Sequence, residues 1–105
     1  MERVYVTYRL RSKEHAEAYE RWSRERDQVV LREQPAILGF EVYMVEDVES
    51  REAAGGSYDV IEEITVSSWE DFQRALETEP LKQLGAEFGD VADPTTVATL
   101  RTRQL

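Results

Sequence analysis

The chain has 105 residues, no cysteine and a formal net charge of −9 from 13 basic and 22 acidic residues. This composition excludes disulfides, thiolate catalysis and thiolate metal sites, and its acidic field disfavours nucleic-acid and membrane-surface partners. No apolar run approaches a membrane span and the N-terminus lacks a signal-peptide layout, so we expect a single cytoplasmic domain over residues 1–105.

The first half of the chain predicts a strand, a long helix and a second strand. Residues 4–10 alternate with period two and are rich in β-branched and aromatic side chains, which is typical of a strand. Ser12 can cap a helix over residues 13–33, and Pro35 ends it because the residue before a proline avoids the α region. Residues 40–45 alternate again and predict the second strand.

The second half repeats the pattern after a polar segment. Residues 46–57, with Gly55 and Gly56 as hinge, predict a long hairpin loop that is either a lid or a solvated connection. Residues 58–66 predict a third strand, and Ser67 with Glu70 predicts a capping box at the start of the second helix. Pro80 breaks that helix and starts a short continuation, before a fourth strand over residues 95–100.

The order β-α-β-β-α-β predicts an α+β, ferredoxin-like fold with an antiparallel sheet and helices on one face. Phe40 and Val42 on one side of the second strand are matched by Tyr43 and Val45 on the other, so neither face is cleanly polar. A sheet covered on both sides favours pairing through the sheet. We therefore expect a homodimer, a dimeric α/β barrel, of about 24 kDa, twice 12.2 kDa.

Several segments, spread over most of the chain, form a pattern by their order and spacing. They are Tyr8-Arg9-Leu10, Tyr19-Glu20-Arg21-Trp22, Arg24-Glu25-Arg26-Asp27, Pro35 before Phe40-Glu41-Val42-Tyr43, Tyr58-Asp59 with Ile61-Glu62, and Trp69-Glu70-Asp71-Phe72. Together these segments resemble the RedY/HapK-like family. The resemblance implies a dimeric α/β-barrel protein of pyrrole or indole natural-product pathways, such as those of prodiginines and bisindoles. Some members of the family are thought to act as cyclases.

The first helix carries a mostly apolar stripe that should face the sheet. At 3.6 residues per turn, seven side chains fall within about 60° of one line. They are His15, Ala18, Tyr19, Trp22, Arg26, Val29 and Val30. Arg26 in this stripe must extend to solvent or meet a carboxylate, and His15 at the helix start is a candidate neutral proton carrier.

Glu62 is the one charge on its side of the third strand, among Tyr58, Val60, Ile64 and Val66. It either pairs with Arg26 or stands in a pocket with a raised pKa, suited to acid–base work. Asp27, at the edge of the helix stripe, is the third acid–base candidate. The alternative for each is structural: a buried ion pair for Arg26 and Glu62, and solvated helix positions for His15 and Asp27.

Aromatic residues supply candidate ligand contacts. Tyr8 and Tyr43 are candidates for pocket lining, because a buried phenol needs both a hydrogen-bond partner and apolar neighbours. Four others serve either the core or a ligand platform: Tyr19, Trp22, Phe72 and Phe88. One histidine and no cysteine predict no metal site, and no phosphate-binding glycine loop is present, so we expect no cofactor; haem on His15 is a minor alternative.

Three functions remain open at this stage. The leading hypothesis is a cofactor-independent cyclase or isomerase that moves protons on a flat aromatic intermediate bound between helices and sheet. Glu62 or Asp27 would act as base, His15 as acid or relay, and Arg26 as orienting group. The alternatives are a non-catalytic binding protein for an unstable intermediate, and a cofactor-free monooxygenase of quinol-like substrates.

Overall fold

The computed structural model describes residues 2–53, 55–56 and 58–105. Within them, four strands form one antiparallel sheet in the order β2-β3-β1-β4. The strands are β1 (Glu2–Leu10), β2 (Ile37–Met44), β3 (Val60–Val66) and β4 (Ala92–Arg101). The helical segments are the 3₁₀ turn η1 (Lys13–His15), α1 (Ala16–Trp22), the π-helical turn η2 (Ser23–Asp27), α2 (Gln28–Arg32), α3 (Val48–Ala53), α4 (Trp69–Leu76) and α5 (Glu79–Phe88). This arrangement confirms the ferredoxin-like α+β fold.

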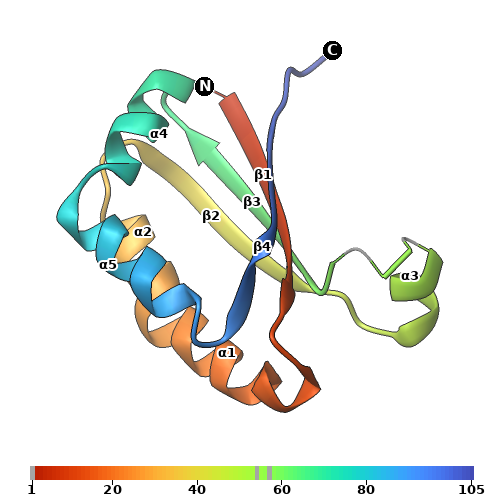
Figure 1. Cartoon of the computed structure of the whole chain (residues 1–105). Helices are drawn as coiled ribbons and strands as arrows, with labels where there is room; N and C mark the ends of the chain where they lie inside the picture. Colours follow the sequence, from red (N-terminus) through yellow and green to blue (C-terminus); the bar gives the residue numbers. More distant parts are fainter. Residues whose placement is uncertain (1, 54, 57) are drawn as a thin grey trace.

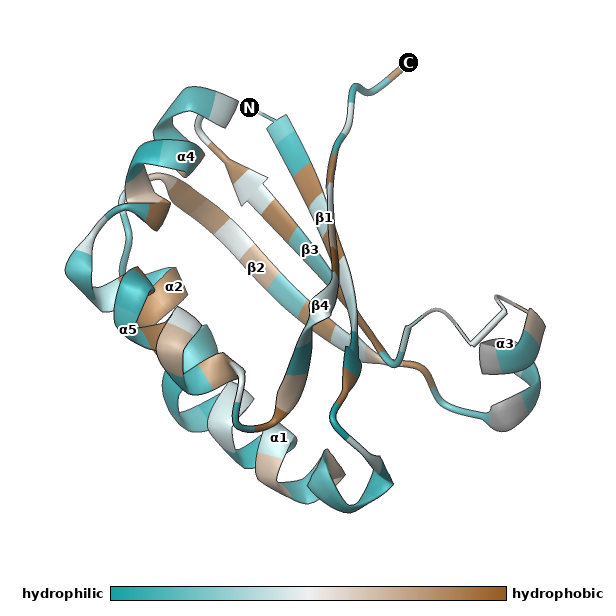
Figure 2. Ribbon diagram, in the orientation of Figure 1, coloured by the Kyte–Doolittle hydropathy of each residue, from teal (hydrophilic) through white to brown (hydrophobic). Residues whose placement is uncertain are grey.

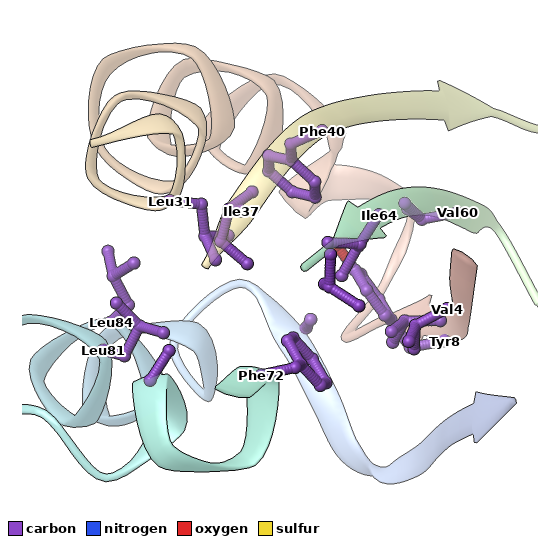
Figure 3. Close-up of a cluster of buried hydrophobic side chains, with 14 of the residues drawn as sticks. Val4, Tyr8, Leu31, Ile37, Phe40, Val60, Ile64, Phe72, Leu81 and Leu84 are labelled. Carbon is purple, nitrogen blue, oxygen red and sulfur yellow. The ribbon is translucent and has the colours of Figure 1, made fainter. Parts of the chain in front are cut away.

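The helices α1, α2, α4 and α5 cover one face of the sheet, and the core lies between the two layers (Figure 1). Hydropathy is mixed along the strands (Figure 2), and Glu62 and Glu63 stand next to each other in β3, so it is burial rather than hydropathy that alternates along this strand. In β1 the inward residues are Val4, Val6, Tyr8 and Leu10, all buried. Leu31 of α2 and Leu84 of α5 contribute to the core from the helices, and Phe40 and Ile64 contribute to it from the sheet (Figure 3).

The long first helix is not a regular α-helix. It begins with a 3₁₀ turn, runs as α1, widens into the π-helical turn η2 and ends as α2 at Arg32, three residues before Pro35. In the π turn the amide of Gln28 donates to the carbonyl of Ser23, five residues back, in place of the usual four. The extra residue changes which side chains face the sheet after Ser23.

The polar segment after β2 contains a helix, which the sequence analysis did not predict. α3 lies beyond the end of the sheet, away from the other helices (Figure 1). Gly55 and Gly56 both have positive φ, 72° and 69°, a conformation that favours glycine. Residues 54 and 57 of the predicted loop lie outside the described residues.

The cap of α4 also differs from the prediction by one residue. Ser68, rather than Ser67, accepts a hydrogen bond from the amide of Asp71 at 3.0 Å. Ser67 instead donates its hydroxyl to the Asp71 carboxylate at 2.8 Å, so the predicted box between Ser67 and Glu70 is wrong. Pro80 lies in the first turn of α5, as expected from its missing amide hydrogen.

Candidate functional site

A cavity of about 220 Å³ lies between the helical layer and the sheet. Its lining comes from every covering helix and three strands: Val6, Tyr8, Trp22, Asp27, Leu31, Glu62, Leu76, Leu81, Leu84, Gly85, Phe88 and Val97. A larger depression of about 750 Å³ lies between the start of β1 and the C-terminal tail. The smaller cavity is the candidate site, because it alone of the two is lined by buried ionisable side chains.

Two carboxyl side chains reach this cavity from opposite layers. Glu62 points inward because β3 alternates, and it shares its side with Val60, Ile64 and Val66. Asp27 points inward because it ends the π turn. Glu62 is 7% exposed and Asp27 is 6% exposed, so both carboxyls are nearly sealed from water.

Burial controls the ionisation of both groups. Loss of hydration and, to a lesser extent, the negative charge of Asp27 raise the pKa of Glu62 to about 8, against the opposing effect of the hydrogen bond from Tyr8. Burial raises the pKa of Asp27 to about 7, and the charge of Glu87 acts in the same direction. The two carboxyls therefore titrate as a pair that carries about one negative charge near neutral pH.

Tyrosine hydroxyls hold Glu62 in place. The Tyr8 hydroxyl donates to Glu62 Oε2 at 2.6 Å and makes a short hydrogen bond with the Tyr19 hydroxyl. Burial raises the pKa of both phenols, so neither ionises near neutral pH. Glu62 thus has a fixed donor on one oxygen.

Aromatic rings form one end of the cavity. The Tyr8 and Phe88 rings lie edge to face at 4.7 Å, with an interplanar angle of 87°. The Trp22 ring is 6.0 Å from that of Phe88 and 6.1 Å from that of Tyr19. These rings give that end of the cavity an aromatic surface.

Glu87 fixes the Trp22 ring from outside the cavity. Its carboxylate accepts from the Trp22 indole nitrogen at 2.8 Å and from Arg26 through two bonds of 3.1 and 2.8 Å. These donors lower the pKa of Glu87 to about 2. Sequence analysis missed Glu87, since no local pattern relates a glutamate on α5 to residues on α1 and η2.

The structure brings together five of the predicted residues at the cavity and adds a sixth behind them. Tyr8, Trp22, Asp27, Glu62 and Phe88 line it, and Tyr19 contacts Tyr8. The sequence analysis did not assign Leu31, Leu76 and Val97 to the site.

Four predicted residues lie elsewhere. The proposed pair of Arg26 and Glu62 is not formed, because the π turn rotates Arg26 outward, where its side chain is 45% exposed and bound to Glu87. Tyr43 is 54% exposed on the uncovered face of the sheet, so it does not line the cleft. Phe72 packs in the core, and the His15 ring lies 2.8 Å from the Ser12 hydroxyl; neither reaches the cavity.

Within the described residues, no three histidine, aspartate or glutamate side chains gather closely enough to hold a metal ion. No helix in the same part of the chain combines the length and apolarity needed to cross a membrane.

The sheet order and the cavity beneath its helices define an α+β protein of the ferredoxin-like class. Within that class, the family model described as REDY-like protein HapK matches residues 2–105. The chain therefore belongs to the HapK family, which confirms the resemblance seen in the sequence.

Solved structures share the fold at low sequence identity. HapK from Hahella chejuensis superposes with a TM-score of 0.82 at 23% identity, covering 100% of this chain and 93% of the other. A dimeric protein of unknown function from Bacteroides fragilis, described as ferredoxin-like, has a TM-score of 0.73 at 10% identity, covering 98% and 95%. The hydroxynitrile lyase from Passiflora edulis has a TM-score of 0.71 at 17% identity, covering 99% and 94%. No curated protein matches the chain.

Proposed function

We propose that this protein is a cofactor-independent enzyme of cyclase or isomerase type, which moves protons on a flat aromatic intermediate derived from pyrrole or indole. The observation that carries the proposal is the pair of buried carboxyls, Glu62 and Asp27, in an apolar cavity with their pKa raised to near neutral. A general acid or base works best when its pKa lies near the working pH.

The pair can supply both halves of a proton transfer. With one charge between them, one carboxylate removes a proton from a carbon or nitrogen of the guest, and the neutral carboxyl donates a proton at another position. The sum is an isomerisation or ring closure with no net change in protons. Tyr8 acts as a positioning residue, because its hydroxyl holds Glu62 by a bond of 2.6 Å.

The rest of the cavity would orient the guest and exclude water. Leu31, Leu81 and Leu84 form apolar walls, and Trp22 and Phe88 supply ring surfaces. Fixing a reactive molecule in one geometry removes much of the entropic part of its barrier. A structural neighbour named as a lyase supports the suitability of the fold for catalysis, although fold alone does not set function.

The test is base catalysis on a simple aromatic carbon acid. 5-Nitrobenzisoxazole is a flat bicyclic probe whose ring opens when a base removes its carbon-bound proton, and the phenolate product is coloured. We expect the wild-type protein to accelerate this opening with a rate that rises between pH 6 and pH 9, as the pair ionises. Glu62→Gln should lower the rate about 100-fold.

Glu25→Gln is the matched control, because it removes one exposed carboxylate near the same π turn and leaves the cavity intact. Its rate should equal that of the wild type. Equal rates for the wild type and Glu62→Gln would leave the cavity as a binding site and remove the assignment of catalysis.

We also propose that the protein forms a homodimer through the uncovered face of the sheet. That face carries a cross-strand row of Tyr43, Ile61 and Thr7, set by the registers of β2, β3 and β1. Tyr43 is 54% exposed and Leu100 on β4 is 51% exposed. A second copy would cover these side chains, and a similar structure is described as dimeric.

A further inference from the structure

The candidate cavity contains acidic groups without a compensating cation. Its ionisable lining residues are Tyr8, Asp27 and Glu62, and no lysine, arginine or histidine occurs among the described residues that line it. Arg26, on the same turn as Asp27, points outward and is bound by both oxygens of Glu87. A negative charge that forms in the cavity therefore lacks a protein partner of opposite sign.

The aromatic end of the cavity favours a positive guest as well. Tyr8, Trp22 and Phe88 form a cluster with ring centroids 4.7 and 6.0 Å apart. Their ring faces carry negative electrostatic potential, and a cation over such a face is stabilised most where water is excluded. The carboxylates and the ring faces therefore both favour a positively charged guest.

We propose that the cavity selects a small, flat aromatic base and holds it as its conjugate acid, with the proton supplied by the Glu62–Asp27 pair. This inference rests on the proposed function, because it names the substrate class of the same site. The volume of about 220 Å³ is smaller than the roughly 300 Å³ at which drug-sized pockets begin, so it accepts a guest of one or two fused rings or that part of a larger molecule.

The proton balance of this step is simple. An O–H bond of a carboxyl breaks, and an imine or pyridine-type nitrogen of the guest, which has a free in-plane lone pair, forms an N–H bond. The products are a carboxylate and a cation in contact, so no oxidant or reductant is needed. Protonation draws electrons from the ring, while the new carboxylate becomes the base that removes a proton elsewhere on the guest.

The experiment compares three bicyclic probes that differ in charge: the cation N-methylquinolinium, the neutral 1-methylquinolin-2-one and the anion 2-naphthoate. Dissociation constants come from amide chemical-shift titrations of the full chain at pH 6 and pH 9. We expect the cation to bind at least about tenfold more tightly than the neutral probe at pH 9, and the anion most weakly. The affinity for the cation should rise from pH 6 to pH 9, because the fixed positive charge favours the ionised pair.

Variants assign the effect to the pair. Glu62→Gln and Asp27→Asn should each reduce the preference for the cation and its pH dependence, whereas Glu25→Gln should leave both unchanged. Equal binding of the cation and the neutral probe would overturn the inference, and so would a preference for the cation that survives in both cavity variants. Neither result would contradict the proposed catalysis, which the ring opening of 5-nitrobenzisoxazole tests separately. Absence of binding by all three probes would overturn the inference and the cavity as a ligand site together.

Discussion

Glu62 is an ionisable side chain held among apolar neighbours, and its burial has a consequence for stability. The pKa of Glu62 rises from an ordinary 4.5 to about 8 in the folded protein. Between these values the folded state keeps a proton that the unfolded chain releases. The stabilising contribution of the neutral carboxyl is therefore complete below about pH 4.5 and is lost as pH rises through about 8.

Glu62→Gln should remove this loss of stability with rising pH. Glutamine has nearly the same shape, accepts the Tyr8 hydrogen bond through its amide oxygen and cannot ionise. Relative to the wild type, the variant should gain on the order of 4 kcal/mol in the free energy of unfolding from pH 5 to pH 9, because each pKa unit corresponds to about 1.4 kcal/mol. Thermal unfolding across this range measures the gain, at about 4 °C or more per kcal/mol.

Two comparisons make that result specific. Glu25→Gln removes an exposed carboxylate and should follow the wild type at every pH. Glu87 contributes to stability with the opposite pH dependence. Its lowered pKa stabilises the folded state above about pH 4.5, and this stabilisation is lost as the pH falls toward 2. If the stabilities of Glu62→Gln and the wild type change in parallel from pH 5 to pH 9, Glu62 is not buried as described.

At the scale of elements, the π turn decides which side chain enters the cavity. Buried side chains recur every four residues through Tyr19, Ser23, Asp27 and Leu31. In a regular α-helix, at about 100° per residue, Asp27 would lie about 80° and Leu31 about 120° away from the line of Tyr19. The wider turn absorbs part of this offset and turns Asp27 toward the sheet.

The same turn explains where sequence reasoning succeeded and failed. Strand alternation grouped Tyr8 with Val4 and Val6, and Glu62 with Val60 and Ile64, because a period of two leaves little freedom, but only the packing of the helices shows that these groups face inward. Regular helical periodicity placed Arg26 inward and Asp27 at the edge, and the extra residue of the π turn reverses that order. Glu87 depends on the packing of α5 against α1 and η2, which no local pattern encodes.

Deletion of Arg24, an exposed residue of the π turn, tests this geometry. With one residue fewer, a regular α-helix places Asp27 and Leu31 within about 20° of the line of Tyr19. We expect the deletion variant to fold with a free energy of unfolding within about 1 kcal/mol of the wild type, measured by urea denaturation.

Insertion of one alanine after Arg24 is the opposite change. It moves Asp27 to about 180° from that line in a regular helix and should cost several kcal/mol. Equal tolerance of the deletion and the insertion would contradict a strict requirement for Asp27 to face the cavity.

At the scale of the whole molecule, one face of the sheet is covered by helices and the other carries exposed Tyr43 and Leu100. The central strands of that open face present Ile61 beside Thr7. A homodimer would bury this surface, and light scattering should then give a mass of about 24 kDa, twice 12.2 kDa.

Ile61→Lys should shift the protein to the monomer, because it places a charge at the centre of the proposed interface. Val29→Lys is the matched control, since Val29 is an exposed apolar residue on the helical side, 47% exposed. It should leave the mass unchanged. A wild-type monomer at micromolar concentration would contradict the proposed dimer.

Both the proposed catalysis and the proposed cation binding depend on two buried carboxyls that share about one negative charge near neutral pH. The most direct measurement is a carboxyl ¹³C NMR titration of Glu62 and Asp27 in the wild-type protein. Apparent pKa values of about 8 and 7, well above those of the exposed carboxylates, are the predicted result. Titration of both groups near pH 4 would contradict the account, because groups with that behaviour would be solvated and fully ionised at neutral pH.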